Sequence, residues 1–129
     1  MRILLDTNAY SALARGEASL AERVRSAERI LVSSIVAGEL LHGFRRGNRH
    51  EANCRQFNAF LARPFVELLP VGLITADRFA RIMAALHAKG RPIPTNDAWI
   101  AAHAMETGAE LLSRDAHFGE IDGLVWTSF

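Results

Sequence analysis

The stretch MRILLDTN, residues 1–8, guides the interpretation of the whole chain. Its apolar run, residues 3–5, is typical of a short buried strand, and it stops at Asp6, Thr7 and Asn8. A buried strand that runs into a carboxylate and two more polar groups delivers them to one edge of a sheet. A single carboxylate there means little, so the question is whether acids from distant segments reach the same edge.

The bulk properties are those of an ordinary globular domain. The chain has 129 residues, 50% of them hydrophobic and 22% charged, with a net charge of +1. We therefore expect a single domain over residues 1–129. The one cysteine, Cys54, cannot form an internal disulfide and fits a reducing cytoplasm. We see no signal peptide and no apolar run near the roughly 20 residues that cross a bilayer, so we expect a cytoplasmic protein without membrane contact.

Short apolar runs alternate with helical patterns along the chain. Strands are expected at residues 3–5, 30–32, 66–69, 110–113 and 124–126, and helices at residues 9–14, 17–27, 34–44, 48–61, 75–88 and 96–107. Thr95 or Asn96 is the expected cap of the last helix. The alternation predicts an α/β fold in three layers, α/β/α, with a central parallel sheet of four to five short strands. Such sheets bind ligands outside the carboxyl ends of their strands, where Asp6 and Asp115 lie.

Glu39 lies on the wrong side of its expected helix for a surface residue. With Ile35 set at 0° and 100° per residue, Glu39 falls at about 40°, inside the apolar arc of about 180°. An ionised carboxylate that faces a core is costly unless something pairs with it. No cation of this helix shares its face, so either a tilted helix or a buried arginine explains it, or Glu39 belongs to a site.

The other acids have ordinary structural explanations when taken singly. Asp6 and Asp97 can cap or complement the dipoles of helices, and an aspartate in a loop, such as Asp115, is common. With Glu39 included, the structural explanation requires four unrelated causes for four acids at one edge of the sheet. Several carboxylates repel one another, and Mg²⁺ or Mn²⁺, which prefer oxygen ligands, resolves this. Such an ion activates water and neutralises phosphoryl charge, which is nuclease-type chemistry.

Other chemistries have weaker signals. The five histidines show no zinc spacing with Cys54 and are expected mostly on the surface or on helix faces; they are His42, His50, His87, His103 and His117. No glycine-rich phosphate loop is present.

Four segments in order resemble the PIN domain, specifically the single-domain VapC-type toxins of bacterial toxin–antitoxin pairs. The segments are LLDTN (4–8), SSIVAGELLHG (33–43), TNDAWIAAHA (95–104) and LLSRDAHF (111–118). The resemblance covers essentially the whole chain. It implies a single PIN domain and a Mg²⁺- or Mn²⁺-dependent endoribonuclease that hydrolyses RNA phosphodiester bonds. It also implies a cognate antitoxin that inhibits the toxin, and a homodimer.

The resemblance also implies roles for particular residues. The catalytic and metal-binding acids would be Asp6, Glu39, Asp97 and Asp115, and the supporting polar residues Thr7, Asn8, Asn96 and Arg114. One departure is that many relatives carry an acid before the phenylalanine of the last segment, where this chain has His117. If that later acid were the working one, Asp115 would have to serve alone.

Two surfaces are expected to meet the partners. Arg45, Arg46 and Arg49, beside Phe44, are candidates for RNA binding, because cations next to an aromatic suit a nucleic-acid backbone and unpaired bases. A solvated charged turn is an equal alternative. Apolar positions on the early helices, namely Tyr10, Leu13 and Leu20, either contact the antitoxin or belong to the core.

Three alternatives remain open. A hydrolase of the haloacid dehalogenase type needs an aspartate where Asn8 stands, and both it and a receiver-type signalling domain need a well-placed lysine. The only lysine, Lys89, is followed by loop residues. The third alternative is a catalytically inactive PIN scaffold that binds RNA. RNA degradation that requires a divalent metal would separate the enzyme from the binding modules.

Overall fold

The computed structural model describes residues 1–129 as a parallel sheet with helices on both faces. The strands are β1 (Arg2–Leu5), β2 (Arg29–Ser33), β3 (Val66–Leu69), β4 (Glu110–Leu112) and β5 (Trp126–Thr127). The helices are α1 (Thr7–Ala14), α2 (Ala18–Ser26), α3 (Ser34–Arg46), α4 (His50–Leu61), α5 (Leu73–Lys89), α6 (Thr95–Thr107) and the 3₁₀ helix η1 (Ala116–Glu120). No helix combines the length and the apolar character needed to cross a bilayer.

The five strands are ordered β3-β2-β1-β4-β5, and every neighbouring pair is parallel. The central strand β1 is covered on both faces, and Ile3, Leu4 and Leu5 are buried. That position explains its unbroken apolar run, since a parallel sheet between two helical layers has no solvated face. The predicted α/β fold with a short-stranded parallel sheet is confirmed.

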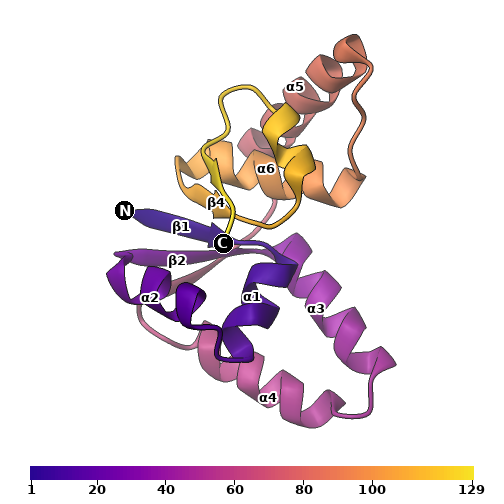
Figure 1. Ribbon diagram of the computed structural model, residues 1–129. Helices are drawn as coiled ribbons and strands as arrows, with labels where there is room; N and C mark the ends of the chain where they lie inside the picture. Colours follow the sequence, from indigo (N-terminus) through magenta and orange to yellow (C-terminus); the bar gives the residue numbers. More distant parts are fainter.

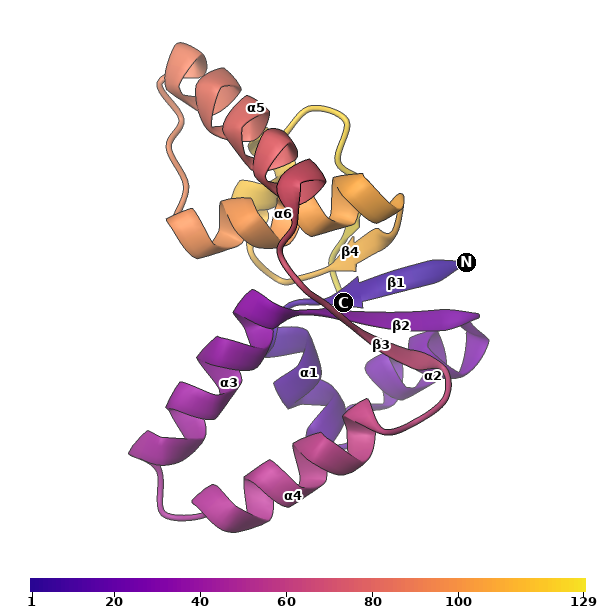
Figure 2. The same cartoon turned by 180° about the vertical axis from the view of Figure 1, so that it is seen from behind.

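The helices form two unequal layers (Figure 1, and from behind in Figure 2). Helices α1 to α4 lie on one side of the sheet, and α5, α6 and η1 on the other. Leu20 and Phe57 from the first layer, and Ile100 and Phe118 from the second, are at most 1% exposed. The core is therefore continuous through the sheet and fixes both layers against it.

Two caps set where the helices leave the sheet. The Asp6 carboxylate accepts a hydrogen bond from the Ala9 N–H at 2.8 Å, and the Ser33 hydroxyl accepts one from Ile35 N–H at 3.0 Å. These residues end or follow the neighbouring strands β1 and β2. Helices α1 and α3 consequently begin side by side at the carboxyl edge of the sheet.

Several predicted boundaries differ from the observed ones: α1 begins at Thr7 rather than residue 9, and α4 at His50 rather than residue 48. Helix α5 begins at Leu73 rather than residue 75, because Thr75 lies inside its first turn and accepts from the Gly72 N–H. Helix α6 is capped by the backbone of Pro94, and neither Thr95 nor Asn96 acts as the cap.

The last strand is also displaced from the predicted 124–126. Leu124 and Val125 precede it, in the connection that follows the left-handed turn at Gly123. Strand β5 starts only at Trp126, which pairs with Leu111 and donates its indole N–H to the Ser113 carbonyl.

Candidate active site

The carboxyl edge of the sheet carries a pocket of about 480 Å³ that is lined mostly by polar residues. Its lining residues are Asp6, Thr7, Asn8, Glu39, Pro94, Thr95, Asn96, Asp97, Ile100 and Asp115. They come from the start of α1, the middle of α3, the start of α6 and the loop after β4. The structure thus brings together the four acids that the sequence analysis selected. The functional roles of these acids remain a prediction.

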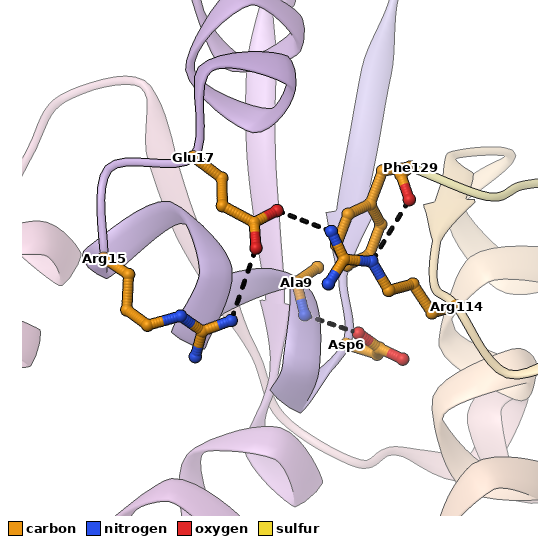
Figure 3. A network of polar contacts seen from close by, with 6 residues as sticks. All are labelled: Asp6, Ala9, Arg15, Glu17, Arg114 and Phe129. Atoms are coloured by element: carbon orange, nitrogen blue, oxygen red, sulfur yellow. Dashed lines mark hydrogen bonds and ion pairs between the residues drawn. The ribbon is translucent and has the colours of Figure 1, made fainter.

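Asp6 is both a helix cap and part of the pocket. It is 4% exposed, and Ala9 N–H holds one of its oxygens (Figure 3). Burial raises the pKa of Asp6, and the charges of Asp115 and Asp97 raise it further, while hydrogen bonds from Ser113 and Ala9 oppose the rise. The structural explanation for Asp6 is therefore correct, and the same carboxylate also lines the pocket.

Glu39 reaches the pocket from α3. The Thr7 hydroxyl donates to its Oε1 at 2.5 Å, and the Asn96 amide nitrogen donates to its Oε2 at 3.3 Å. Both partners are neutral, and no arginine pairs with Glu39, so the buried-arginine explanation was wrong. Thr7 and Asn96 are neighbours of Asp6 and Asp97 in the sequence, and they tie Glu39 to both acids.

Asp97 projects from the first turn of α6 and is half-buried. Its Oδ2 lies 2.7 Å from the His117 Nε2. Burial raises the pKa of Asp97 and the His117 contact lowers it, whereas the nearby Asp115 and Glu39 raise it. Two of the four acids thus have raised pKa values, the expected effect of packing carboxylates into one poorly solvated place.

His117 is the residue that the sequence analysis missed. It lies in η1, two residues beyond Asp115, and it was expected among surface or helix-face histidines. One ligand atom each from Asp97, Asp115 and His117 lie within 4.8 Å of one another. Its position in the segment LLSRDAHF could have indicated this role, because the resemblance places an acid there in many relatives.

Arg114, predicted as a supporting residue, does not line the pocket. Its guanidinium donates to Glu17 Oε2 at 2.5 Å and to the Phe129 carbonyl at 3.1 Å, and it lies 4.3 Å from the centre of the Phe129 ring (Figure 3). Glu17 also pairs with Arg15. Arg114 therefore links the last residue, Phe129, to the connection between α1 and α2.

His103, on α6, is buried, unlike the other four histidines. Its Nε2 lies 3.1 Å from the Pro70 carbonyl and its Nδ1 lies 2.9 Å from the Ser33 hydroxyl. A carbonyl only accepts, so Nε2 carries the proton and Nδ1 accepts from Ser33. This contact links α6 to the cap of α3, the two helices that carry Asp97 and Glu39.

Comparison with known proteins places this geometry in a family. The PIN domain profile matches residues 3–124. The chain belongs to the PIN domain family. It is 31% identical over 131 residues to Ribonuclease VapC1 of Haemophilus influenzae strain R2866, a match covering 98% of this chain and 96% of that one. It is 27% identical to the tRNA(fMet)-specific endonuclease VapC of Shigella flexneri, over 96% and 95% of the two chains.

Solved structures agree with this PIN domain along its whole length. A chain of the DNA-bound VapBC2 complex of Rickettsia felis matches with a TM-score of 0.88 and 25% identity, over 100% of this chain and 99% of that one. The DNA-bound VapBC complex of Salmonella typhimurium gives a TM-score of 0.89 and 26% identity, over 99% and 98%. The chain is thus a PIN domain of the VapC type.

The three arginines proposed for RNA binding lie beyond the pocket of the PIN domain. Arg45 and Arg46 end α3 and Arg49 precedes α4, and all three are exposed and free of ion pairs. Arg46 follows Glu39 by seven residues, about 10 Å along the helix axis. Arg49, but neither Arg45 nor Arg46, lines a polar hollow at the turn between α3 and α4.

A second hollow of the PIN domain is apolar. This groove, of about 480 Å³, is lined by Tyr10, Leu13, Ala14, Ala21, Val24, Arg25, Gln56, Ala59, Phe60, Arg63 and Phe65, from α1, α2, α4 and the start of the connection to β3. Among the predicted antitoxin contacts, Leu20 is core at 0% exposed and Tyr10 is 4% exposed, although its ring lines the groove. Leu13 is half-buried at the groove.

Proposed function

We propose that this PIN domain is a divalent-metal-dependent endoribonuclease, the toxin of a toxin–antitoxin pair, whose acids Asp6, Glu39, Asp97 and Asp115 hold Mg²⁺ or Mn²⁺. The observation that carries the proposal is the convergence of four carboxylates from four segments on one pocket without a lysine or arginine in its lining. The names of the relatives, which include ribonucleases and an endonuclease, support RNA as the substrate.

The residues of the pocket suit such an ion. Their donors are carboxylate and amide oxygens, the ligands that Mg²⁺ and Mn²⁺ prefer. The raised pKa values of Asp6 and Asp97 are caused first by burial, and in part by neighbouring acids. A divalent cation would offset that repulsion, which no lysine or arginine of the pocket lining compensates.

The side chains are held ready for this task. Ala9 N–H fixes Asp6, while Thr7 and Asn96 fix the two oxygens of Glu39. Ligands locked in this way are positioned before substrate arrives, which lowers the cost of binding. When bound, the ion supplies an activated water at neutral pH and stabilises charge on a phosphoryl oxygen.

The rim of the pocket suits single-stranded RNA. Asn8 and Asn96 are exposed amides that can hydrogen-bond a phosphate or a 2′-hydroxyl. Arg45, Arg46 and Arg49 would hold the backbone beyond the reacting phosphate. A net charge of +1 is too small to attract RNA by itself, so this local group carries the electrostatic attraction.

The apolar groove is the proposed docking site of the antitoxin. The solved structures that the chain resembles are VapBC complexes. An apolar segment of the partner would cover Leu13, Val24 and Phe60, and acidic residues of the partner could meet Arg25 and Arg63 at the rim. The groove and the pocket share helix α1, whose first residues line the pocket and whose last residues line the groove.

A second copy of the chain has a separate place to pack. Leu68, Val71, Leu73 and Ile74 are exposed apolar residues at the edge strand β3 and the start of α5, and Leu73 is 87% exposed. Clustered exposed apolar side chains mark association surfaces. We propose this patch as the homodimer interface.

Metal removal tests the proposed function. The purified chain, freed of antitoxin, should degrade RNA with Mg²⁺ or Mn²⁺, lose that activity in EDTA and regain it when the ion is restored. RNA binding without any cleavage would instead favour the inactive scaffold. Cleavage that persists in EDTA would contradict the assignment of the four acids.

A further inference from the structure

His117 lies beside two acids of the pocket, Asp97 and Asp115, although it does not line the pocket itself. Its Nε2 lies 2.7 Å from Asp97 Oδ2, and its side chain is one third exposed. The adjacent Phe118 is 1% exposed, so η1 is anchored in the core and keeps the imidazole in place. The histidine is therefore a fixed part of the site.

We propose that His117 is a ligand of the divalent ion and that it makes the site prefer a first-row transition ion, such as Mn²⁺, over Mg²⁺. This inference rests on the proposed function, since it concerns the same pocket. Mn²⁺ is thereby expected to bind more tightly than Mg²⁺ because of the imidazole.

The geometry admits His117, Asp97 and Asp115 as ligands of one ion. Their ligand atoms lie within 4.8 Å of one another. In an octahedron with bonds of about 2.1 Å, adjacent ligand atoms are about 3 Å apart and opposite ones about 4.2 Å. Neutral imidazole can move its proton from Nε2, where it is now donated to Asp97, to Nδ1, and the Nε2 lone pair is then available to an ion.

The chemistry of the donor decides the preference. Mg²⁺ prefers oxygen ligands and sheds water reluctantly, whereas imidazole suits transition ions. An acid at position 117 would keep the site all-oxygen and suited to Mg²⁺. The histidine exchanges one charged oxygen donor for a neutral nitrogen donor, and so lowers the affinity for Mg²⁺ more than that for Mn²⁺.

A positioning role is the competing explanation, in which His117 only orients Asp97 through their hydrogen bond. Two variants separate the roles. His117→Gln places an amide N–H near the position of Nε2 and can keep the bond to Asp97, but it offers no imidazole. His117→Asp restores an acid. The control is His87→Gln, on the exposed surface of α5.

Pulsed electron paramagnetic resonance of bound Mn²⁺ reads the ligand directly. The wild-type chain and His87→Gln should show the nitrogen coupling of a bound imidazole, and both His117 variants should lose it. Calorimetric titration should show the ratio of Mn²⁺ to Mg²⁺ affinity falling about tenfold or more in His117→Asp. Circular dichroism establishes that each variant is folded.

The outcomes distinguish this inference from the proposed function. Mn²⁺ bound without imidazole coupling, or an affinity ratio that His117→Gln and His117→Asp leave unchanged, would overturn the role of His117 while leaving the ribonuclease intact. A wild-type chain that binds no divalent ion at all would overturn both.

Discussion

The acidic pocket and the apolar groove have the same volume, about 480 Å³, and opposite character. The pocket collects carboxylates with raised pKa values, which weakens the fold. The groove leaves aromatic and aliphatic side chains uncovered between α1, α2 and α4. Each therefore departs from what stability alone would favour, in a way that suits an ion in one case and a protein partner in the other.

We expect substitutions in the pocket and in the groove to have independent effects. Helix α1 is the only element that contributes to both, with Thr7 and Asn8 at its start facing the pocket and Leu13 and Ala14 at its end facing the groove. A substitution in one hollow should therefore spare the function of the other.

The largest effect is expected at the acids. Asp97→Asn removes a proposed ligand with almost no change of shape, and RNA cleavage should fall by about 100-fold or more. Antitoxin binding should be unchanged, because Asp97 lies outside the groove. A gel assay of RNA cleavage measures the rate. The control is Asp77→Asn on α5, whose carboxylate pairs with Arg81 at the surface and should not affect cleavage.

The converse is expected in the groove. Ala59→Glu on α4 would place a charged, bulkier side chain in the apolar groove, and the affinity for the antitoxin should fall by about tenfold or more. Cleavage of RNA by the free chain should stay at the wild-type rate. Ala84→Glu, the same change on the exposed surface of α5, is the control. Equal loss of affinity in both variants would place the partner elsewhere.

A smaller effect is expected at the rim. Charge reversal of Arg45 and Arg46 should weaken RNA binding several-fold and flatten its salt dependence by about 0.7 in log–log slope for each phosphate that is no longer neutralised. The reaction of bound RNA should keep its rate, because neither arginine lines the pocket. Salt-dependent binding assays measure the slope, with Arg81→Glu as the control. An unchanged slope would make these arginines ordinary solvated charges.

The smallest effect is on stability. Asp6 has a raised pKa in the folded chain, so the folded state holds its proton more tightly than the unfolded state, and stability falls as pH rises above about 4. Asp6→Asn keeps a capping side chain and removes the charge. Without divalent ions it should be more stable than wild type by about 1 kcal/mol at neutral pH, and its advantage should vanish below about pH 4.

Thermal unfolding between acid and neutral pH measures this difference. Asp77→Asn, at an exposed paired carboxylate, should gain nothing over the same range. Added Mn²⁺ should reverse the order, because it binds the folded wild type and raises its stability by mass action. If Asp6→Asn were less stable than wild type at every pH, the charge of Asp6 would not destabilise the folded chain.

The sequence predicts the sheet and much of the pocket for identifiable reasons. Asp6 and Asp115 follow apolar strands, and parallel strands end at one edge. Glu39 is revealed by helical periodicity, since it falls on an apolar arc. The end of an apolar run and the helical period can both be read from neighbouring residues, so these predictions need no knowledge of contacts between distant segments.

The remaining features depend on contacts between distant segments. His117 acquires its place only because η1 packs beside the start of α6, twenty residues earlier in the chain. Arg114 turns from the pocket because Glu17 and Phe129 offer it partners. Strand β5 begins late because its pairing with β4 follows a turn at Gly123. Neither composition nor spacing contains this information.

The central claim is that acids from separate segments share one ion, and the most direct test is a calorimetric titration of Mn²⁺ into the wild-type chain, Asp6→Asn, Glu39→Gln and Asp97→Asn. We expect saturable binding by the folded wild type and a loss of about tenfold or more in affinity in each variant. Wild-type affinity retained in all three variants would contradict the account.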